Sequence, residues 1–319
     1  MTAVAPPPRP PALRGLPWSV VRLHRVALWL WIAFVAAGAG WLLWALWLTA
    51  GYDPACAPRC IDREPYNAFI PLLLQGRVMA LLPLAVAAFA GGALIGREME
   101  RGTAALAWTQ SVSPARWLAA KLAVPALLLT AGTAGLALLF RWVWTTGHPE
   151  DRPRWFENDV FLATGPAGLA RVLLALAVGA LAGTVVRRTL SGMGLAFTAT
   201  LLTTVALALA RSHLWPTTRW TGFEAARLPI GSDRMEVGIV TAGGELVPGI
   251  ECNMDRPGDL EQCLRDNGWT DVYAVGHPAS HYWPLQLVET GTVLALAALA
   301  CWACFALLRR RTAEVGPVG

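Results

Sequence analysis

The sequence GREMERGTAALAWTQSVSPARWLAAKL, residues 96–122, joins two long apolar segments of the chain. Gly102 favours the left-handed backbone conformation that commonly ends a helix, so we expect the helix before it to stop after Arg101. Thr103 is then a suitable N-cap for a short helix over 104–110. The stretch therefore predicts a short helix between two longer ones.

A second helix start follows within the same stretch. Ser113 precedes Pro114, which is the order expected of an N-cap and a first helical residue. The short helix would then lie across the end of a pair of membrane helices, where its polar groups suit docking onto another protein. An ordinary solvated turn is the alternative. These polar groups are Glu98, Glu100, Arg101, Thr109 and Gln110.

The composition of the whole chain is that of a membrane protein. Of its 319 residues, 55% are hydrophobic and 15% are charged, and the mean hydropathy is +0.46. Soluble domains carry about 25% charged residues, and disordered chains are less hydrophobic and more charged. The net charge is +5, but the basic residues, all arginine except Lys121, lie at the ends of apolar segments. This distribution argues against a nucleic-acid partner.

Six apolar segments are long enough to cross a bilayer, whose core of about 30 Å requires about 20 apolar residues of helix. They are 26–48, 78–95, 118–140, 169–186, 190–210 and 285–308. We therefore predict an all-α protein with six transmembrane helices embedded in the lipid bilayer.

The basic residues near the ends of these spans predict the orientation. With a cytoplasmic N-terminus, the inside segments hold 13 basic residues and the outside segments hold 5. The loop 211–283 is left out of this comparison because long loops translocate largely regardless of charge. The excess predicts a multi-pass protein of the plasma membrane with both termini in the cytoplasm.

Four cysteines would then face the oxidising side. Cys56 and Cys60 lie in the first outer loop, and Cys252 and Cys263 lie in the last one. Two disulfides are expected there. We favour pairing within each loop; pairing between the loops and a four-cysteine metal site are alternatives, although the spacing is weak for a metal.

We expect no catalytic residues and no metal site. His277 and His281 are four residues apart, but Pro278 interrupts the helix that would align them on a metal ion.

The stretch 96–122 resembles the signature of permease subunits of ATP-binding-cassette exporters of the second permease class (ABC-2), of a type V-like and actinobacterial kind. In that signature an acidic pair and Gly-Thr precede a TQ-(S/P)-V-S-x-x-R run and a basic residue. The matching residues are Glu98, Glu100, Gly102, Thr103, Thr109, Gln110, Ser111, Val112, Ser113, Arg116 and Lys121. Further similar segments are VRLHR at 21–25, GTVVRRTL at 183–190 and WPLQLVETG at 283–291.

The resemblance implies a coupling helix between spans two and three, a large outer loop before span six, a separate cytoplasmic ATPase and a dimeric pore. The pore would be a permease homodimer or a pair of permeases. The chain contains no GxxxxGK[ST] phosphate loop, so the partner would hydrolyse ATP and this chain would bind no cofactor and be no enzyme. The residues expected at the ATPase contact are Arg97, Glu98, Glu100, Arg101, Gly102, Thr103, Thr109, Gln110, Ser113 and Arg116.

Three ionisable residues lie within one or two helical turns of the outer ends of the predicted spans, namely Arg77, Arg171 and Glu289. Charges in a membrane are rare and usually paired or functional. Glu289 could form a structural pair with either arginine. Alternatively it borders an exit gate, in which case Glu289→Gln should lower transport more than the folded yield.

These interpretations divide the chain into four parts. They are a Pro-rich cytoplasmic tail with an elbow segment over 1–25, spans one to five over 26–210 with the coupling loop 96–117, a small strand-bearing extracytoplasmic subdomain over 211–283, and span six with a basic cytoplasmic tail over 284–319. The predicted function is the permease subunit of an ATP-driven exporter. The alternative is a membrane anchor or sensor that presents the subdomain 211–283.

Overall fold

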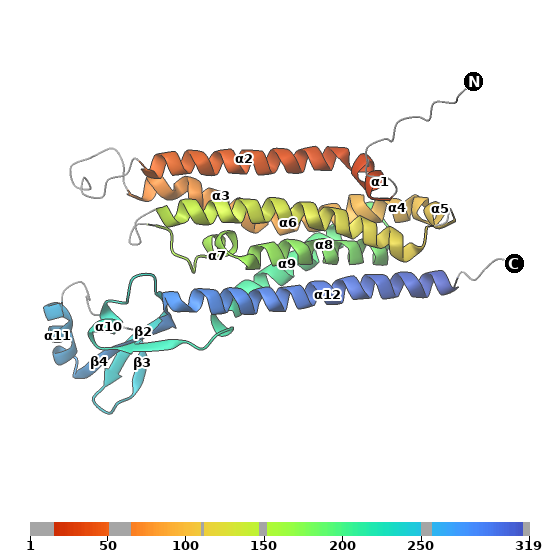
Figure 1. Cartoon of the computed structure of the whole chain (residues 1–319). Coiled ribbons are helices and arrows are strands. Elements are labelled where there is room, and N and C mark those ends of the chain that lie inside the picture. Colours follow the sequence, from red (N-terminus) through yellow and green to blue (C-terminus); the bar gives the residue numbers. More distant parts are fainter. Residues whose placement is uncertain (1–15, 51–64, 110–111, 147–151, 250–256, 315–319) are drawn as a thin grey trace, which may run out of the picture.

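Long helices lie side by side and carry a small β-sheet at one end (Figure 1). This computed structural model describes residues 16–50, 65–109, 112–146, 152–249 and 257–314. The long helices are α2 (Arg25–Ala50), α3 (Pro65–Phe89), α6 (Pro114–Thr146), α8 (Pro166–Val186), α9 (Thr189–Ala210) and α12 (Tyr282–Glu314). The shorter helices are α1 (Leu16–Leu23), the π-helix η2 (Ala90–Gly96), α4 (Arg97–Glu100), α5 (Thr103–Thr109), α7 (Asn158–Thr164), η3 (Arg211–His213), α10 (Phe223–Ala226), α11 (Pro257–Asp266) and η4 (Ala279–His281).

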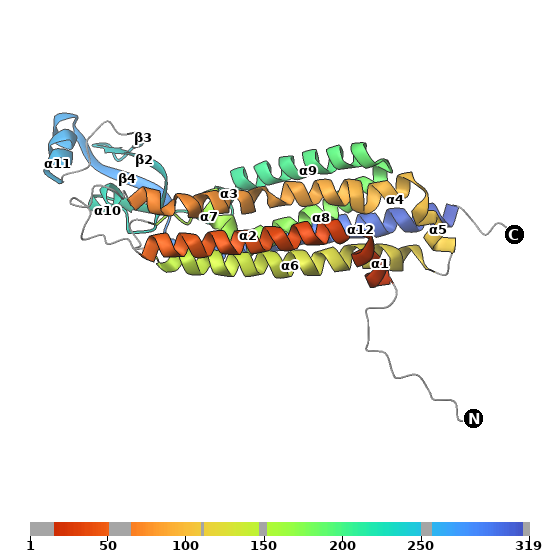
Figure 2. The ribbon, with the colours of Figure 1, turned by 90° about the horizontal axis from the view of Figure 1, so that it is seen from above.

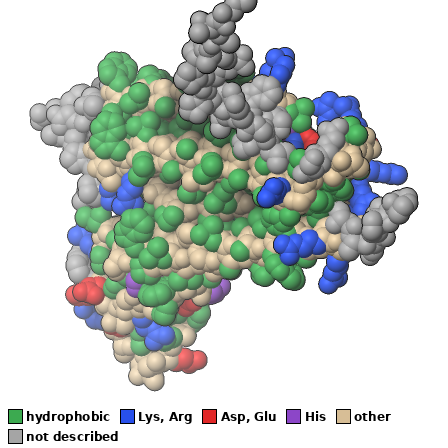
Figure 3. Space-filling model, turned by 45° about the vertical axis from the view of Figure 1, so that its right-hand side comes forward, with side chains coloured by type: hydrophobic (Ala, Val, Ile, Leu, Met, Phe, Trp, Pro, Cys, Tyr) green, Lys and Arg blue, Asp and Glu red, His purple; other side chains and the backbone are tan. Residues whose placement is uncertain are grey.

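Six helical segments are long and apolar enough to cross a membrane, which confirms the predicted fold class. They are Arg25–Leu48, Phe69–Glu100, Pro114–Thr146, Pro166–Val186, Thr189–His213 and Ala279–Arg311. Large apolar side chains such as Trp29, Leu127 and Trp302 lie exposed on the outside of the bundle. Hydrophobic side chains cover much of the visible face in Figure 3. Lipid rather than water suits such a surface, so the chain is a multi-pass membrane protein.

The second span is longer than the predicted segment 78–95, because it begins at Phe69. Arg77 ended the apolar run in the sequence. In the structure it does not interrupt α3, since its guanidinium lies on the surface of the helix and pairs with Asp159 at 3.2 Å.

The centre of the bundle is α8, which packs backbone to backbone against the π-helix η2. A Cβ atom on Gly179 would lie 2.6 Å from the carbonyl oxygen of Ala87, at the end of α3, and 3.1 Å from the nitrogen of Gly91 in η2. The carbonyl oxygen of Gly91 would lie 2.7 Å from a Cβ on Gly183 and 2.8 Å from one on Gly192, in α9. These distances are too short for any side chain. The backbones of η2, α8 and α9 can approach this closely only because glycine occupies these positions.

The predicted small subdomain is present as a four-stranded antiparallel sheet in the order β1-β4-β2-β3. The strands are β1 (Thr218–Thr221), β2 (Asp233–Thr241), β3 (Leu246–Pro248) and β4 (Trp269–His277). Trp220, Ile239 and Val272 are buried between the sheet and Leu260 of α11. The subdomain thus has a hydrophobic core of its own.

The two ends of the bundle carry different elements (Figures 1 and 2). The sheet and α7 lie toward one end. At the other end lie α1, α4, α5 and the last turns of α12. Since α1 and the last turns of α12 lie at the same end of the bundle, the chain passes from one end to the other an even number of times.

Candidate functional site

The turn from the second span into α5 has the predicted backbone. Gly102 has a positive φ of 70°, which ends the helix after Arg101 as expected. The prediction for Thr103 is wrong, because it is the first residue of α5 and not its N-cap. Its hydroxyl donates to the carbonyl oxygen of Glu98 at 3.3 Å, while the carbonyl of Gly102 accepts the first helical bond, from Leu106. Thr103 therefore ties α5 back to α4.

The start of α6 is also as predicted. The Ser113 hydroxyl accepts the backbone N–H of Arg116 at 3.3 Å, and Pro114 is the first helical residue. Trp108 of α5 meets Trp117 of α6 edge to face, with ring centroids 5.8 Å apart. This aromatic contact holds the short helix against α6.

A buried chain of polar side chains links the turn between α1 and α2 to α6 and α4. Glu98 of α4 forms an ion pair with Lys121 of α6, and both side chains are largely buried, at 14% and 5% exposed. The Lys121 ammonium also lies 3.3 Å from Nε2 of His24, in the turn between α1 and α2. Burial, followed by the charges of Lys121 and Arg97, lowers the pKa of His24 to about 4. His24 is therefore neutral at pH 7, and a neutral imidazole can accept the hydrogen bond of Lys121.

A second link fastens α4 to the turn between α8 and α9. The carboxylate of Glu100 accepts hydrogen bonds from both the backbone N–H, at 2.8 Å, and the hydroxyl of Thr189. This turn is sharp because Arg187 has a positive φ of 56°. Arg311 of α12 donates to the carbonyl oxygen of Thr184 at 2.6 Å. The contacts at this end of the bundle thus connect all six spanning helices.

The outer surface of α5 is exposed. Leu106 is 60% exposed, and Arg101, Thr103 and Thr109 are exposed beside it. Gln110 lies outside the described residues. Lys and Arg side chains are frequent toward this end of the molecule in Figure 3. Exposed basic residues here include Arg22, Arg25, Arg97, Arg116, Arg187, Arg188, Arg309 and Arg310.

The opposite end holds a buried cluster of charges. Glu289 of α12 is fully buried and pairs with Arg171 of α8, whose Nη2 and Nε lie 2.5 and 2.9 Å from Oε1. The predicted pairing of Glu289 with Arg171 is confirmed, whereas Arg77 pairs with Asp159 instead. The second partner of Glu289 is Arg211, at 2.9 Å from Oε2.

Sequence reasoning missed Arg211 because it assigned this residue to the long outer loop. Its place directly after the apolar run 190–210 was the available signal. Arg211 lies 4.0 Å above the ring of Phe161 and donates to Asn158 at 3.1 Å, and both partners belong to α7. The sequence did not predict α7, which packs inside the bundle with five buried residues. Gln286 joins it to α8 by accepting the N–H of Ala167 and donating to the carbonyl of Phe161.

The cysteine predictions fall mostly outside the described residues, where Cys56, Cys60 and Cys252 lie. Cys263 of α11 is disulfide-bonded. Within the described residues Cys301 and Cys304 of α12 are free thiols, so the partner of Cys263 lies outside that part of the chain. The pairing stays a prediction.

The two histidines lie closer than the sequence suggested. The Nδ1 atoms of His277 and His281 are 3.1 Å apart, because η4 turns the chain directly after Pro278. Nε2 of His277 lies 3.2 Å from the carbonyl oxygen of Ser212.

Comparison with known proteins gives one match. A family model described as ABC-2 membrane transporter related matches residues 26–211, more than half of the chain. No curated protein and no solved structure matches the chain. The matched segment holds the first five spans and the α4–α5 segment, and it ends at Arg211, before the sheet.

Proposed function

The chain belongs to the ABC-2 membrane transporter related family, and on this premise we propose that it is the permease subunit of an ATP-driven exporter. Members of this family are transmembrane permeases of ABC transporters, so the chain is a transport component that lies in the membrane and works with an ABC ATPase. The proposal adds the export direction, a cytoplasmic position of the α4–α5 end, and α5 as the contact for the ATPase.

The position of α5 carries this proposal. It is exposed at the end of the bundle and fastened to the spans on two sides, by Trp108 against Trp117 and by α4. Glu98 connects α4 to α6, and Glu100 connects it to α9. A force on α5 would thus reach the second, third and fifth spans together. Such a segment suits the conversion of ATPase closure into alternating access.

The excess of basic residues at this end supports its cytoplasmic position. In a dimeric pore the two copies would each present one α5 to one ATPase. The transported path would then form between the copies, and the chain would act without hydrolysing ATP itself.

The experiment uses a charge placed on the exposed face of α5. The chain is co-expressed with an ABC ATPase subunit of its own organism, and the ATPase recovered with the tagged permease and its ATP hydrolysis in proteoliposomes are measured. Leu106→Glu should lower recovery roughly tenfold or more, since a buried leucine contributes about 1.5–3 kcal/mol. Folded yield should be unchanged because this side chain is 60% exposed.

The matched control is Leu246→Glu in β3, an exposed leucine at the opposite end. It should leave both readings unchanged. Full recovery and full ATP hydrolysis with Leu106→Glu would overturn the assignment of α5, and recovery of no ATPase with the unaltered chain would favour the anchor or sensor alternative.

A further inference from the structure

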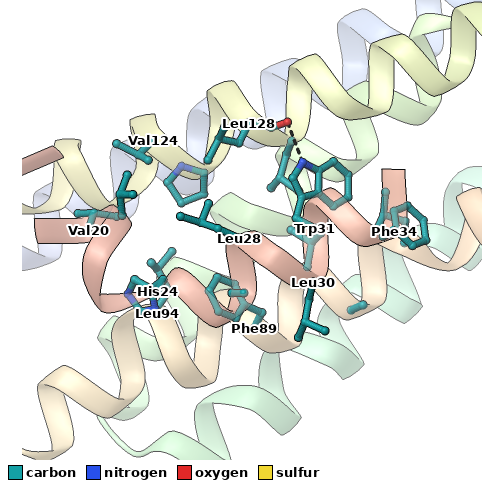
Figure 4. Close-up of a pocket in the computed structure, with 17 residues that line it drawn as sticks. Val20, His24, Leu28, Leu30, Trp31, Phe34, Phe89, Leu94, Val124 and Leu128 are labelled. Atoms are coloured by element: carbon teal, nitrogen blue, oxygen red, sulfur yellow. Dashed lines mark hydrogen bonds between the residues drawn. The ribbon is translucent and has the colours of Figure 1, made fainter. Parts of the chain in front are cut away.

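An apolar cavity of about 310 Å³ lies between α2, α3 and α6 (Figure 4). Figure 4 shows side chains of these helices and of η2 turned toward one another around it. All lining residues except His24 are apolar or aromatic, including Trp31, Phe89 and Leu128. The indole N–H of Trp31 donates to the carbonyl oxygen of Leu128 at 3.1 Å, which fixes the wall between α2 and α6.

The cavity has the length of one leaflet. Its lining extends from His24, directly before α2, to Phe34 of α2, and ten residues of helix rise about 15 Å. This is half of a hydrocarbon core about 30 Å thick. Leu30 of α2 and Leu128 of α6, both in the lining, are 67% and 37% exposed, so this part of the cavity wall reaches the lipid-facing surface of the bundle.

A second cavity of about 440 Å³ adjoins the first at the coupling end. The two cavities share Val20 and His24, which lie one helical turn apart. The second is polar and is lined by Arg97, Arg101 and the pair of Glu98 with Lys121, among others. The apolar cavity therefore borders a polar chamber at the end of the spans.

The charges of the polar chamber are unbalanced. Glu98 is neutralised by Lys121. Arg97 and Arg101 are exposed, and neither forms an ion pair with any other described residue. They are four residues apart along one helical face, where like charges repel each other. A bound anion between them would remove this repulsion.

We propose that the two cavities together bind one anionic phospholipid from the leaflet at the coupling end. One acyl chain lies in the apolar cavity along α2, and the phosphate lies between Arg97 and Arg101. The inference requires a chain that spans the bilayer and does not require the ATPase. Lipid binding can therefore be disproved while the proposed ATPase contact holds, and the ATPase contact can be disproved while lipid binding holds.

The test measures lipid bound to the purified chain alone. Native mass spectrometry compares retention of a phosphatidylglycerol and a phosphatidylcholine with the same acyl chains. The unaltered chain should retain the anionic lipid roughly thirtyfold better, since each of the two arginines contributes about 1 kcal/mol near a lipid surface. Arg97→Gln with Arg101→Gln should remove the difference, whereas Arg97→Lys with Arg101→Lys should keep it. Arg310→Gln, at the same end but outside the chamber, is the control.

A second variant tests the acyl-chain cavity. Ala27→Trp fills it and should lower retention of both lipids, while Ala33→Trp, exposed on α2 outside the cavity, should not. Inorganic phosphate in excess should not displace the lipid. Equal retention of the two lipids, an equal loss with Arg310→Gln, unchanged retention with Ala27→Trp, or displacement by phosphate would each overturn the proposal.

Discussion

Glu100 and Thr189 join the α4 end of the second span to the first residue of the fifth. One carboxylate accepts both the backbone N–H and the hydroxyl of Thr189. We predict that Glu100→Gln leaves the folded yield unchanged, since the side chain is exposed, and lowers the ATP hydrolysis that the permease stimulates in its partner. Thr189→Val removes only the hydroxyl bond and should have a smaller effect of the same kind, and the double variant should be no worse than Glu100→Gln alone. Additive losses would show that the two residues act separately.

The pair of Glu98 and Lys121 should behave as a buried ion pair. Lys121→Met leaves a buried carboxylate, so we expect a loss of stability of about 3 kcal/mol. Glu98→Gln added to it should restore most of this loss, as measured by thermal unfolding of the detergent-purified chain. A double variant as unstable as Lys121→Met would contradict a direct pair.

His24 should make the chain sensitive to acid. Its pKa is about 4 in the folded chain and 6.5 in an unfolded one, so the unfolded state binds more protons between these values. The contribution of neutral His24 is complete above pH 6.5 and is lost as the pH falls toward 4. His24→Leu should flatten the dependence of Tm on pH in this window. His213→Leu, on an exposed residue of η3, should leave it unchanged.

Glu289 should be needed for folding. It is fully buried between Arg171 and Arg211, so Glu289→Gln leaves two buried guanidinium groups without a counter-charge. We expect a loss of stability on the order of 3–5 kcal/mol and a lower folded yield in fluorescence-detected size-exclusion chromatography. Arg77→Gln should change the yield little, because its pair with Asp159 is exposed. Normal yield with lost transport would instead favour the gate interpretation of Glu289.

The orientation can be tested by labelling with a membrane-impermeant maleimide. Ala105→Cys on α5 should react only when the cytoplasmic face is accessible, whereas Glu245→Cys, in the turn before β3, should react in intact cells. Labelling of the unaltered chain measures the reaction of its native cysteines and is subtracted as background. Reaction of Ala105→Cys in intact cells would reverse the topology and remove the proposed ATPase contact.

The sequence predicted elements whose signals are local. Apolar length identified the six spans, and the conformational freedom of Gly102 and the Ser113 cap located the ends of the helices around α5. Small polar motifs of this kind depend only on neighbouring residues. The resemblance was likewise carried by such a motif, and the match to residues 26–211 confirms it at the level of the ABC-2 family; the type V-like and actinobacterial kind stays a prediction.

What the sequence did not predict depends on contacts between distant segments. Arg77 ended an apolar run in the sequence, but in the structure it forms an ion pair with Asp159, which is 82 residues later in the chain. Arg211 was predicted to lie in the outer loop, but in the structure it contacts Glu289 of α12 and Phe161 of α7. The role of His24 required Lys121, 97 residues later in the chain. No window of neighbouring residues contains these partners.

The glycine contacts of η2 have a mechanical consequence. Gly91 touches α8 at Gly183 and α9 at Gly192, so the backbones of these helices are in direct contact with no side chains between them that could repack. We therefore expect η2, α8 and α9 to move together as one block. Trp31 likewise packs closely over Gly132 and donates to Leu128, so we expect α2 and α6 to move as a second block. Any rocking of the permease during a transport cycle would have to occur at the seam between the two blocks.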